Sequence, residues 1–97
     1  MKLDNEKGVM DFFEAVLSLK DKEECTAFFS DICTIKELLD FGQRREVATA
    51  LSKGMNYQEI SEKTGASSAT ISRVNRCLMY GEGGYRTILD RLDKENK

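Results

Sequence analysis

The sequence predicts an all-α protein of about six helices that include a helix-turn-helix. The 97-residue chain has no proline, so no rigid ring interrupts a helix. Its apolar residues recur at helical spacing in nearly every segment, and the strict alternation typical of strands is absent. The length suits one compact domain, which we expect to span residues 1–97.

The N-terminal segment predicts two short amphipathic helices. The first covers about residues 8–19. Asp21 and Glu24 form a capping-box pattern, in which each side chain bonds a free backbone amide, so the second helix begins there. The apolar positions are Val9, Phe12, Phe13, Val16 and Leu17 in the first helix, and Cys25, Phe28, Phe29 and Ile32 in the second.

A longer third helix is predicted next. Thr34 with Glu37 repeats the capping-box pattern, and Gly54 marks the end, because glycine readily takes the left-handed conformation of a C-terminal cap. The apolar positions of this helix are Leu38, Leu39, Phe41, Val47, Ala48 and Leu51. We assign residues 1–53 to a helical core and dimer interface, since the phenylalanine-rich first helices carry more apolar surface than one small monomer covers.

Residues 56–79 predict a helix-turn-helix, two short helices joined by a three-residue turn that contains glycine. Asn56 and Glu59 form the third capping box, and the first of these helices ends at Thr64. Residues 65–67 form the turn, where glycine permits a backbone conformation that a side chain resists. This geometry is typical of proteins that place the second helix in the major groove of DNA.

The second helix of this motif, about residues 68–79, is the predicted recognition helix. Its inner side chains are expected to pack against Ile60, which leaves small, hydroxyl and arginine side chains outside. Small residues allow close approach to DNA, and hydroxyl and guanidinium groups bond bases or phosphates. The inner residues are Ile71, Val74 and Leu78. The expected DNA contacts are Ser67, Ser68, Ala69, Thr70, Ser72, Arg73 and Arg76, with Gln58 on the preceding helix.

The C-terminal segment predicts a connector and a last helix. Residues 81–84 are rich in glycine but lack the phosphate-loop pattern and follow no strand, so we interpret them as a connector. The last helix covers residues 85–93, and we expect residues 1–7 and 93–97 to fray. The apolar face of this helix holds Tyr85, Ile88, Leu89 and Leu92.

Charge is distributed unevenly along the chain. Residues 1–40 hold five lysines and ten acidic residues, whereas residues 41–97 hold ten basic and seven acidic residues. Basic residues neutralise DNA phosphates, so DNA contacts are expected in the second part despite a net charge of −2. The acidic part would then face away from DNA or serve in assembly.

Several classes of protein are disfavoured by the composition. No apolar stretch approaches the roughly 20 residues that a membrane span needs, and the first residues lack the apolar region of a signal peptide, which predicts a cytoplasmic protein. The chain has no histidine, the commonest general acid-base residue, and we expect no catalytic residues and no enzyme activity.

The cysteines do not predict a disulfide framework or a metal site. Cys25, Cys33 and Cys77 are odd in number and lack close spacing, and no histidine is available as a further zinc ligand. We expect reduced thiols, mostly packed as small apolar side chains.

Two further interpretations of the sequence stay open. The recognition motif could be an ordinary amphipathic hairpin with a polar outer face. Alternatively, the chain could be a helical protein-interaction module whose acidic N-terminal helices bind a protein partner without direct DNA readout.

Residues 34–92 resemble the Trp repressor superfamily, and especially its YerC/YecD-type relatives. The matching segments are Thr34-Ile35-Lys36-Glu37, Phe41-Gly42-Gln43-Arg44, Leu51-Ser52-Lys53-Gly54 and 65–73, Gly-Ala-Ser-Ser-Ala-Thr-Ile-Ser-Arg. The resemblance implies an intertwined all-α homodimer that acts as a sequence-specific repressor. Such a dimer would bind a two-fold operator in double-stranded DNA, with half-sites about one helical turn apart.

The resemblance also implies positions for an effector site. Arg44, Arg73 and Thr34 match residues that hold tryptophan in the Trp repressor, although both arginines could instead be ordinary phosphate or salt-bridge residues. Val74 stands where the family has a small glycine, and Cys77 replaces a serine that contacts the ligand. We therefore expect no tryptophan corepressor and no other cofactor, and either a different small effector or none.

Overall fold

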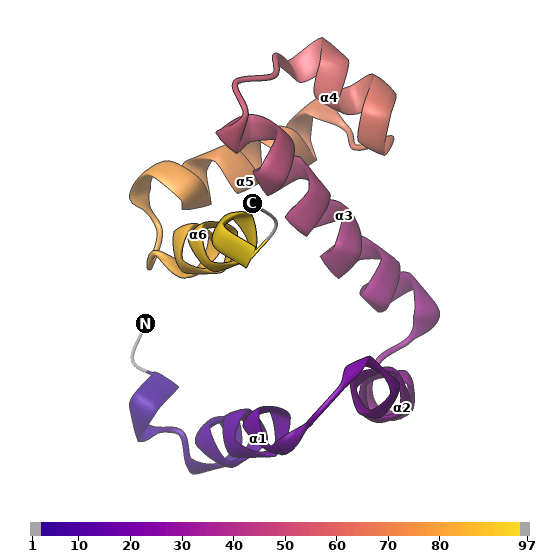
Figure 1. Ribbon diagram of the computed structural model, residues 1–97, viewed down its shortest axis with the longest axis vertical. Helices are drawn as coiled ribbons and strands as arrows, with labels where there is room; N and C mark the ends of the chain where they lie inside the picture. Colours follow the sequence, from indigo (N-terminus) through magenta and orange to yellow (C-terminus); the bar gives the residue numbers. More distant parts are fainter. Residues whose placement is uncertain (1–2, 96–97) are drawn as a thin grey trace. The chain divides into compact units, whose positions relative to one another are not determined.

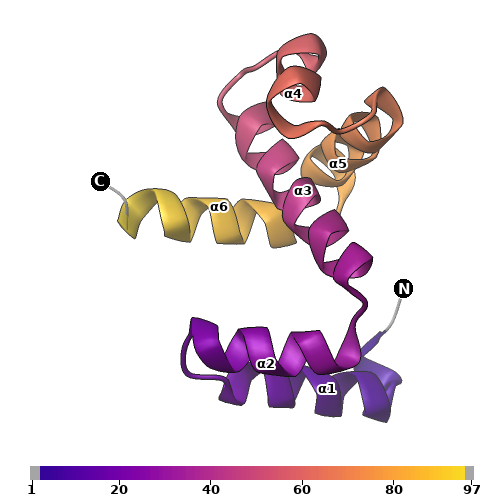
Figure 2. The same ribbon diagram turned by 90° about the vertical axis from the view of Figure 1, so that its right-hand side faces the viewer.

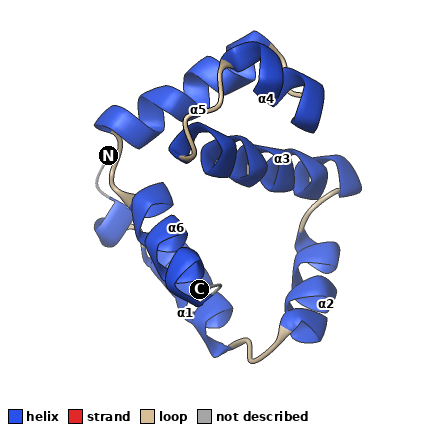
Figure 3. Cartoon of the chain, turned by 45° about the horizontal axis from the view of Figure 1, so that its top comes forward, coloured by secondary structure: helices blue, strands red, loops and turns tan. Residues whose placement is uncertain are grey.

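The computed structural model describes residues 3–95, and these form helices without any strand, as Figure 3 shows. The predicted all-α fold with six α-helices is confirmed. A short 3-10 helix (η1, Leu3–Asn5) precedes the α-helices, whose bounds are α1 Lys7–Ser18, α2 Lys22–Ile32, α3 Ile35–Ser52, α4 Tyr57–Thr64, α5 Ser68–Tyr80 and α6 Gly84–Glu95 (Figure 1). None of the described helices is long and apolar enough to cross a membrane.

The chain falls into two compact units, the first ending at Leu38 and the second beginning at Leu39. The boundary lies inside α3, so this helix begins in the first unit and continues through the second. This division does not test whether residues 1–97 form a single domain with a dimerisation region and a helix-turn-helix, so that assignment stays a prediction.

The first unit is built around four phenylalanines of α1 and α2. The rings of Phe12 and Phe28 stack with centroids 5.9 Å apart, and those of Phe28 and Phe29 meet edge to face at 5.6 Å. Such arrangements are favourable for aromatic rings. Nevertheless no residue of η1, α1 or α2 is buried, and the side chain of Leu17 is 83% exposed. Much of the apolar surface in this unit is therefore uncovered within one chain.

The second unit contains the buried core. In Figures 1 and 2, α4 and α5 lie against the C-terminal half of α3, and α5 also contacts α6. The apolar stripe of each helix faces this junction, because burial of apolar side chains stabilises the packed arrangement. The buried residues are Val47, Ala48 and Ala50 of α3, Ile60 of α4, Ala66 of the turn, Ile71, Val74 and Leu78 of α5, and Leu89 of α6.

Side-chain caps begin the helices near their predicted positions. At α3, Thr34 Oγ1 accepts a hydrogen bond from the Glu37 amide at 3.1 Å, and a Glu37 carboxylate oxygen accepts one from the Thr34 amide at 2.8 Å. At α2, Asp21 accepts from the Glu24 amide at 2.8 Å, but the Glu24 carboxylate bonds the amide of Lys20. The reciprocal half of the capping box predicted at Asp21 is therefore displaced by one residue.

The end of α3 confirms the prediction at Gly54. This glycine has φ of +82°, a left-handed conformation that favours glycine. Its amide donates to the carbonyl of Leu51 at 3.0 Å, and the amide of Met55 donates to the carbonyl of Ala50 at 3.2 Å. These two bonds satisfy carbonyl groups that the last turn of a helix leaves free, and Met55 packs on the core.

The described residues at both ends of the chain are helical, although fraying is predicted there. Residues 3–5 form η1, and α1 already begins at Lys7, where the side chain donates a hydrogen bond to Asp11 at 2.6 Å one helical turn later. Helix α6 begins at Gly84 and continues through Glu95, two residues beyond the predicted end. Residues 1–2 and 96–97 lie outside the described part, and fraying of residues 1–7 and 93–97 stays a prediction.

Candidate nucleic-acid interface

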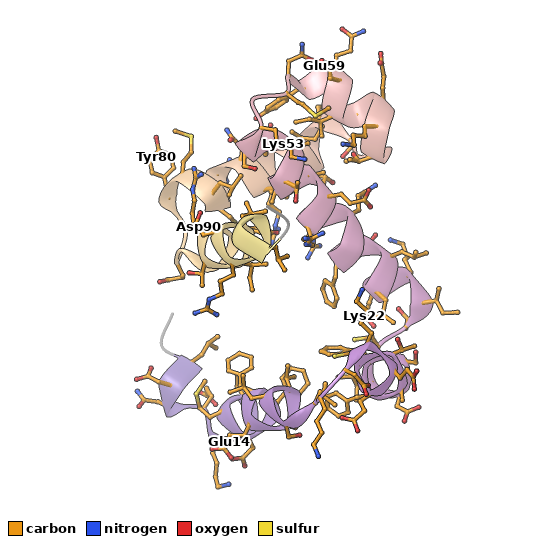
Figure 4. All side chains as sticks on the ribbon, viewed as in Figure 1. Glu14, Lys22, Lys53, Glu59, Tyr80 and Asp90 are labelled. Atoms are coloured by element: carbon orange, nitrogen blue, oxygen red, sulfur yellow. The ribbon has the colours of Figure 1, made fainter. Side chains whose placement is uncertain are left out.

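Helix α4 is fixed at its start by the predicted capping box. Asn56 Oδ1 accepts a hydrogen bond from the Glu59 amide at 2.9 Å, and a Glu59 carboxylate oxygen accepts one from the Asn56 amide at 3.0 Å. Figure 4 shows Glu59 on the outer side of this helix. Ile60 points the other way and is 0% exposed. The two faces of α4 are thus separated as the sequence predicts.

The turn between α4 and α5 has the expected glycine geometry. Gly65 has φ of +76° and its amide donates to the carbonyl of Ser61 at 2.8 Å, which ends α4. Ala66 is buried, so the turn packs on the core rather than projecting into solvent. The geometry matches the short, glycine-containing connection of a helix-turn-helix.

Two polar residues that sequence reasoning did not single out also hold this turn. The side-chain amide of Gln43 on α3 donates to the carbonyl of Thr64 at 3.2 Å. The Thr64 hydroxyl accepts from the Ala66 amide at 3.1 Å and donates to the carbonyl of Ile60 at 2.8 Å. A sequence signal did exist for Gln43, because it lies on the same helical stripe as the buried Val47 and would need a polar partner.

The start of α5 is organised by a pair of hydroxyl groups. Ser67 Oγ accepts a hydrogen bond from the Thr70 amide at 3.2 Å and donates to the Thr70 hydroxyl at 3.1 Å. Thr70 is half-buried, whereas Ser67 is exposed. Both side chains therefore stabilise the helix start, and their expected DNA contacts stay predictions.

The remaining predicted DNA contacts on α5 share its outer face. The inner face consists of Ile71, Val74 and Leu78, all buried as expected. The exposed predicted contacts on this helix are Ser68, Ala69, Ser72, Arg73 and Arg76. The helix thus presents small and hydroxyl side chains at its start and two guanidinium groups farther along.

Gln58 lies on the exposed surface of α4, where its side-chain amide is 3.4 Å from a Glu62 carboxylate oxygen one turn later. The contact is long and on the surface, so Gln58 can exchange it for another acceptor. A DNA phosphate would be such an acceptor.

The three predicted effector residues have separate surroundings. Thr34, in the first unit, uses its hydroxyl to cap α3. The guanidinium carbon of Arg44 lies 5.8 Å from the Phe41 ring centroid, a distance suited to a cation-π contact. Arg73 is exposed on α5, while Val74 beside it is 1% exposed within the core. The valine that replaces a glycine therefore fills buried space.

A cavity of about 170 Å³ lies between α3 and α4. None of the three predicted effector residues lines it. Its lining residues are Arg45, Glu46, Thr49 and Lys63.

All three cysteines are free thiols. Their predicted packing is wrong for two of them, since Cys25 and Cys77 are exposed and Cys33 is half-buried. Cys77 lies beside the buried stripe of α5, whereas Cys25 shares the stripe of Phe28 and Phe29 on α2, a helix that buries no residue. Among the described residues, no group of acidic or cysteine side chains is arranged to hold a metal ion.

Comparison with known proteins assigns this helical arrangement to a family. The sequence pattern of the Trp repressor protein family matches residues 7–93. The chain belongs to the Trp repressor family. It is 50% identical over 94 residues to the uncharacterized protein YerC of Bacillus subtilis, covering 95% of this chain and 90% of YerC.

Two crystal structures of the Trp repressor family share the fold. A TrpR-like protein from Eubacterium eligens has a TM-score of 0.91 and 52% identity, with 95% of this chain and 94% of that chain covered. A candidate Trp repressor from Staphylococcus aureus has a TM-score of 0.90 and 40% identity, with 96% and 95% covered. The Trp repressor family consists of DNA-binding regulators rather than enzymes.

Proposed function

We propose that this protein is a sequence-specific transcriptional repressor that binds double-stranded DNA as a homodimer through its helix-turn-helix. The observation that carries the proposal is the division of α5 into two faces. Its apolar side chains are buried against α4 and α3, while the predicted DNA-reading side chains are exposed together. Membership of a regulator family supports the same function.

The chemistry of the exposed face suits the major groove. Ser68 and Ala69 at the helix start are small, so the backbone can come close to base edges, and an alanine methyl can contact a thymine methyl. The Ser72 hydroxyl can form a hydrogen bond with a donor or an acceptor group on a base edge. Arg73 and Arg76 can bond guanine edges or phosphates. A bond to guanine would read the base sequence, whereas a bond to a phosphate would position the protein on the DNA.

The homodimer is supported by the first unit. Its four phenylalanine rings pack with one another, yet the unit buries no residue in η1, α1 or α2. A second copy of the chain would cover the exposed apolar residues, as removal of apolar surface from water is favourable. A two-fold dimer would place two recognition helices on half-sites about 34–36 Å apart. This function also implies a cytoplasmic protein.

Regulation by free tryptophan is not part of the proposal. Val74 is buried where the family resemblance gives glycine, so the space for an indole ring is reduced. A different small effector, or none, agrees better with this side chain.

Selection of bound sequences from a pool of random duplex DNA tests the function directly. We expect enrichment of an inverted repeat, with half-sites separated by about one helical turn. Binding of the enriched duplex should weaken steeply with rising salt, because phosphate contacts release counterions. A pool without enrichment, together with salt-independent capture of a protein partner by α1 and α2, would instead favour a protein-interaction module.

A further inference from the structure

We propose that Gln43 and Thr64 act as positioning residues that anchor the helix-turn-helix to α3 and thereby fix the recognition helix for DNA readout. This inference rests on the proposed function and adds to it residues outside the DNA-reading face. It is carried by a hydrogen bond between two helices and by the bonds that continue from it into the turn.

The bond joins residues 21 positions apart in the chain. Gln43 Nε2 donates to the Thr64 carbonyl at 3.2 Å, and both residues are half-buried. Thr64 is the last residue of α4, where backbone carbonyls have no partner within the helix. A side chain from α3 therefore satisfies a group that α4 cannot satisfy itself. The bond specifies where the end of α4 lies on α3.

From Thr64 the bonding continues through the turn. The Thr64 hydroxyl accepts from the amide of Ala66, and one residue later Ser67 begins the cap of α5. Gly65, between them, lies next to the Gln43 side chain, and its φ of +76° gives the turn its direction. Residues 64–67 thus connect the Gln43 side chain on α3 to the first turn of the recognition helix.

Apolar packing alone would hold these helices less specifically. Ile60, Ile71 and Val74 are buried in one core, but the hydrophobic effect that favours their burial has no direction. Hydrogen bonds are directional, and a binding site works only when its groups are held within about 0.5 Å of the productive geometry. Helix α4 has 8 residues, a length that is marginal without tertiary support. An oriented bond at its end is therefore suited to setting the register of the turn.

The test uses three variants of the full-length protein. Gln43→Met keeps the side-chain length and removes the donor, whereas Gln43→Lys keeps a donor. Thr49→Val is the matched control, because the Thr49 hydroxyl donates to the carbonyl of Arg45 within α3. Amide hydrogen exchange is followed at Gly65 and Ala66 and in the middle of α3 and α5. Affinity is measured for the inverted-repeat duplex enriched from the random pool.

We expect Gln43→Met to speed exchange at Gly65 and Ala66 roughly fivefold, the change that loss of one hydrogen bond gives, and to weaken DNA binding by a similar factor. Exchange in the middle of α3 and α5 should stay at the wild-type rate. Gln43→Lys should keep the wild-type exchange rates at Gly65 and Ala66. Thr49→Val should change neither these exchange rates nor the DNA affinity.

Two results would overturn the anchor while leaving the proposed function intact. One is wild-type protection of Gly65 in Gln43→Met, and the other is faster exchange with unchanged DNA affinity. If Gln43→Met loosens the whole chain, equal loosening in Gln43→Lys also contradicts a role for the donor. Wild-type protein that binds no duplex would overturn the proposed function instead, and the exchange measurements would still decide whether the bond orders the turn.

Discussion

Ser67 and Thr70 are joined by two hydrogen bonds at the start of α5, the proposed recognition helix. The Ser67 hydroxyl accepts from the Thr70 amide at 3.2 Å and donates to the Thr70 hydroxyl at 3.1 Å. The hydroxyl proton of Ser67 is therefore directed to the Thr70 hydroxyl oxygen. Among the hydroxyl groups of this segment, those of Ser68 and Ser72 are exposed without such a role in the cap.

This difference predicts that Ser67→Ala destabilises the protein and Ser68→Ala does not. Loss of a serine N-cap costs about 1 kcal/mol, because an amide in the first turn loses its acceptor. Thermal unfolding of the two variants in the same buffer measures the difference. Equal melting temperatures for both variants and the wild type would contradict the cap.

A second prediction concerns two glycines whose replacement by alanine should change the stability of the protein in opposite directions. Gly65→Ala should destabilise the protein by about 1–2 kcal/mol, since its φ of +76° is unfavourable for a side chain even though nothing crowds the Cβ. Gly42→Ala should stabilise α3 by roughly 0.5–1 kcal/mol, because its Cβ would meet no atom within 4 Å and alanine favours helix. Denaturant unfolding compares both variants. A stabilising effect of Gly65→Ala would show that the turn has another conformation.

Features of the structure that depend on neighbouring residues could be predicted from the sequence. The caps at Thr34, Asn56 and Ser67 follow from residues three positions apart, and the helical stripes follow from short-range spacing. The Gln43 to Thr64 bond could not be predicted in this way, because it depends on how α3 and α4 meet after folding.

The division of the chain after Leu38 was also outside the reach of the sequence pattern. It falls within the continuous helix α3, without the flexible linker that usually marks a boundary, although the charge balance changes near residue 40. Exposure of Cys25 and Cys77 was missed for a related reason. Cysteine is often buried, but Cys77 lies beside the packed stripe of α5, and Cys25 lies on α2, which buries no residue within one chain.

The outer face of α5 predicts the effects of two arginine variants. Arg73→Ala and Arg76→Ala should each weaken DNA binding while leaving the melting temperature unchanged, because both side chains are exposed. Loss of a base contact costs about 1–3 kcal/mol of binding free energy. Loss of a phosphate contact reduces the slope of log affinity against log salt concentration by about one. Arg86→Ala, at an exposed position on α6, is the matched control. Normal binding by both α5 variants would mean that another surface contacts DNA.

The uncovered apolar surface of the first unit predicts a dimer. Wild-type protein should sediment as a dimer at low concentration. Leu17→Asp should shift the protein toward monomer, since Leu17 is 83% exposed within one chain and burial of a leucine contributes about 1.5–3 kcal/mol. Ser18→Asp adds the same charge at the next exposed position and should leave the dimer intact. A stable folded wild-type monomer would remove the two-fold operator from the proposed function.

The last prediction is that free tryptophan does not control DNA binding. Val74 is 1% exposed in the core, so an indole at this place would have to displace its side chain, and overfilling a packed site costs about 1–3 kcal/mol. Cys77 lacks the hydroxyl oxygen that the family resemblance places there, and a thiol is a weaker acceptor. Arg44 already lies against the ring of Phe41.

Calorimetry with tryptophan and titration of the selected duplex with and without it measure the two halves of this prediction. We expect no tryptophan isotherm and equal DNA affinity in both titrations. Val74→Gly is the informative variant, because it restores the space that valine occupies, and tryptophan binding gained by this variant would identify the side chain as the cause. A clear isotherm with the wild-type protein, accompanied by tighter DNA binding, would contradict the prediction, since the buried valine would then have to move aside for the ligand.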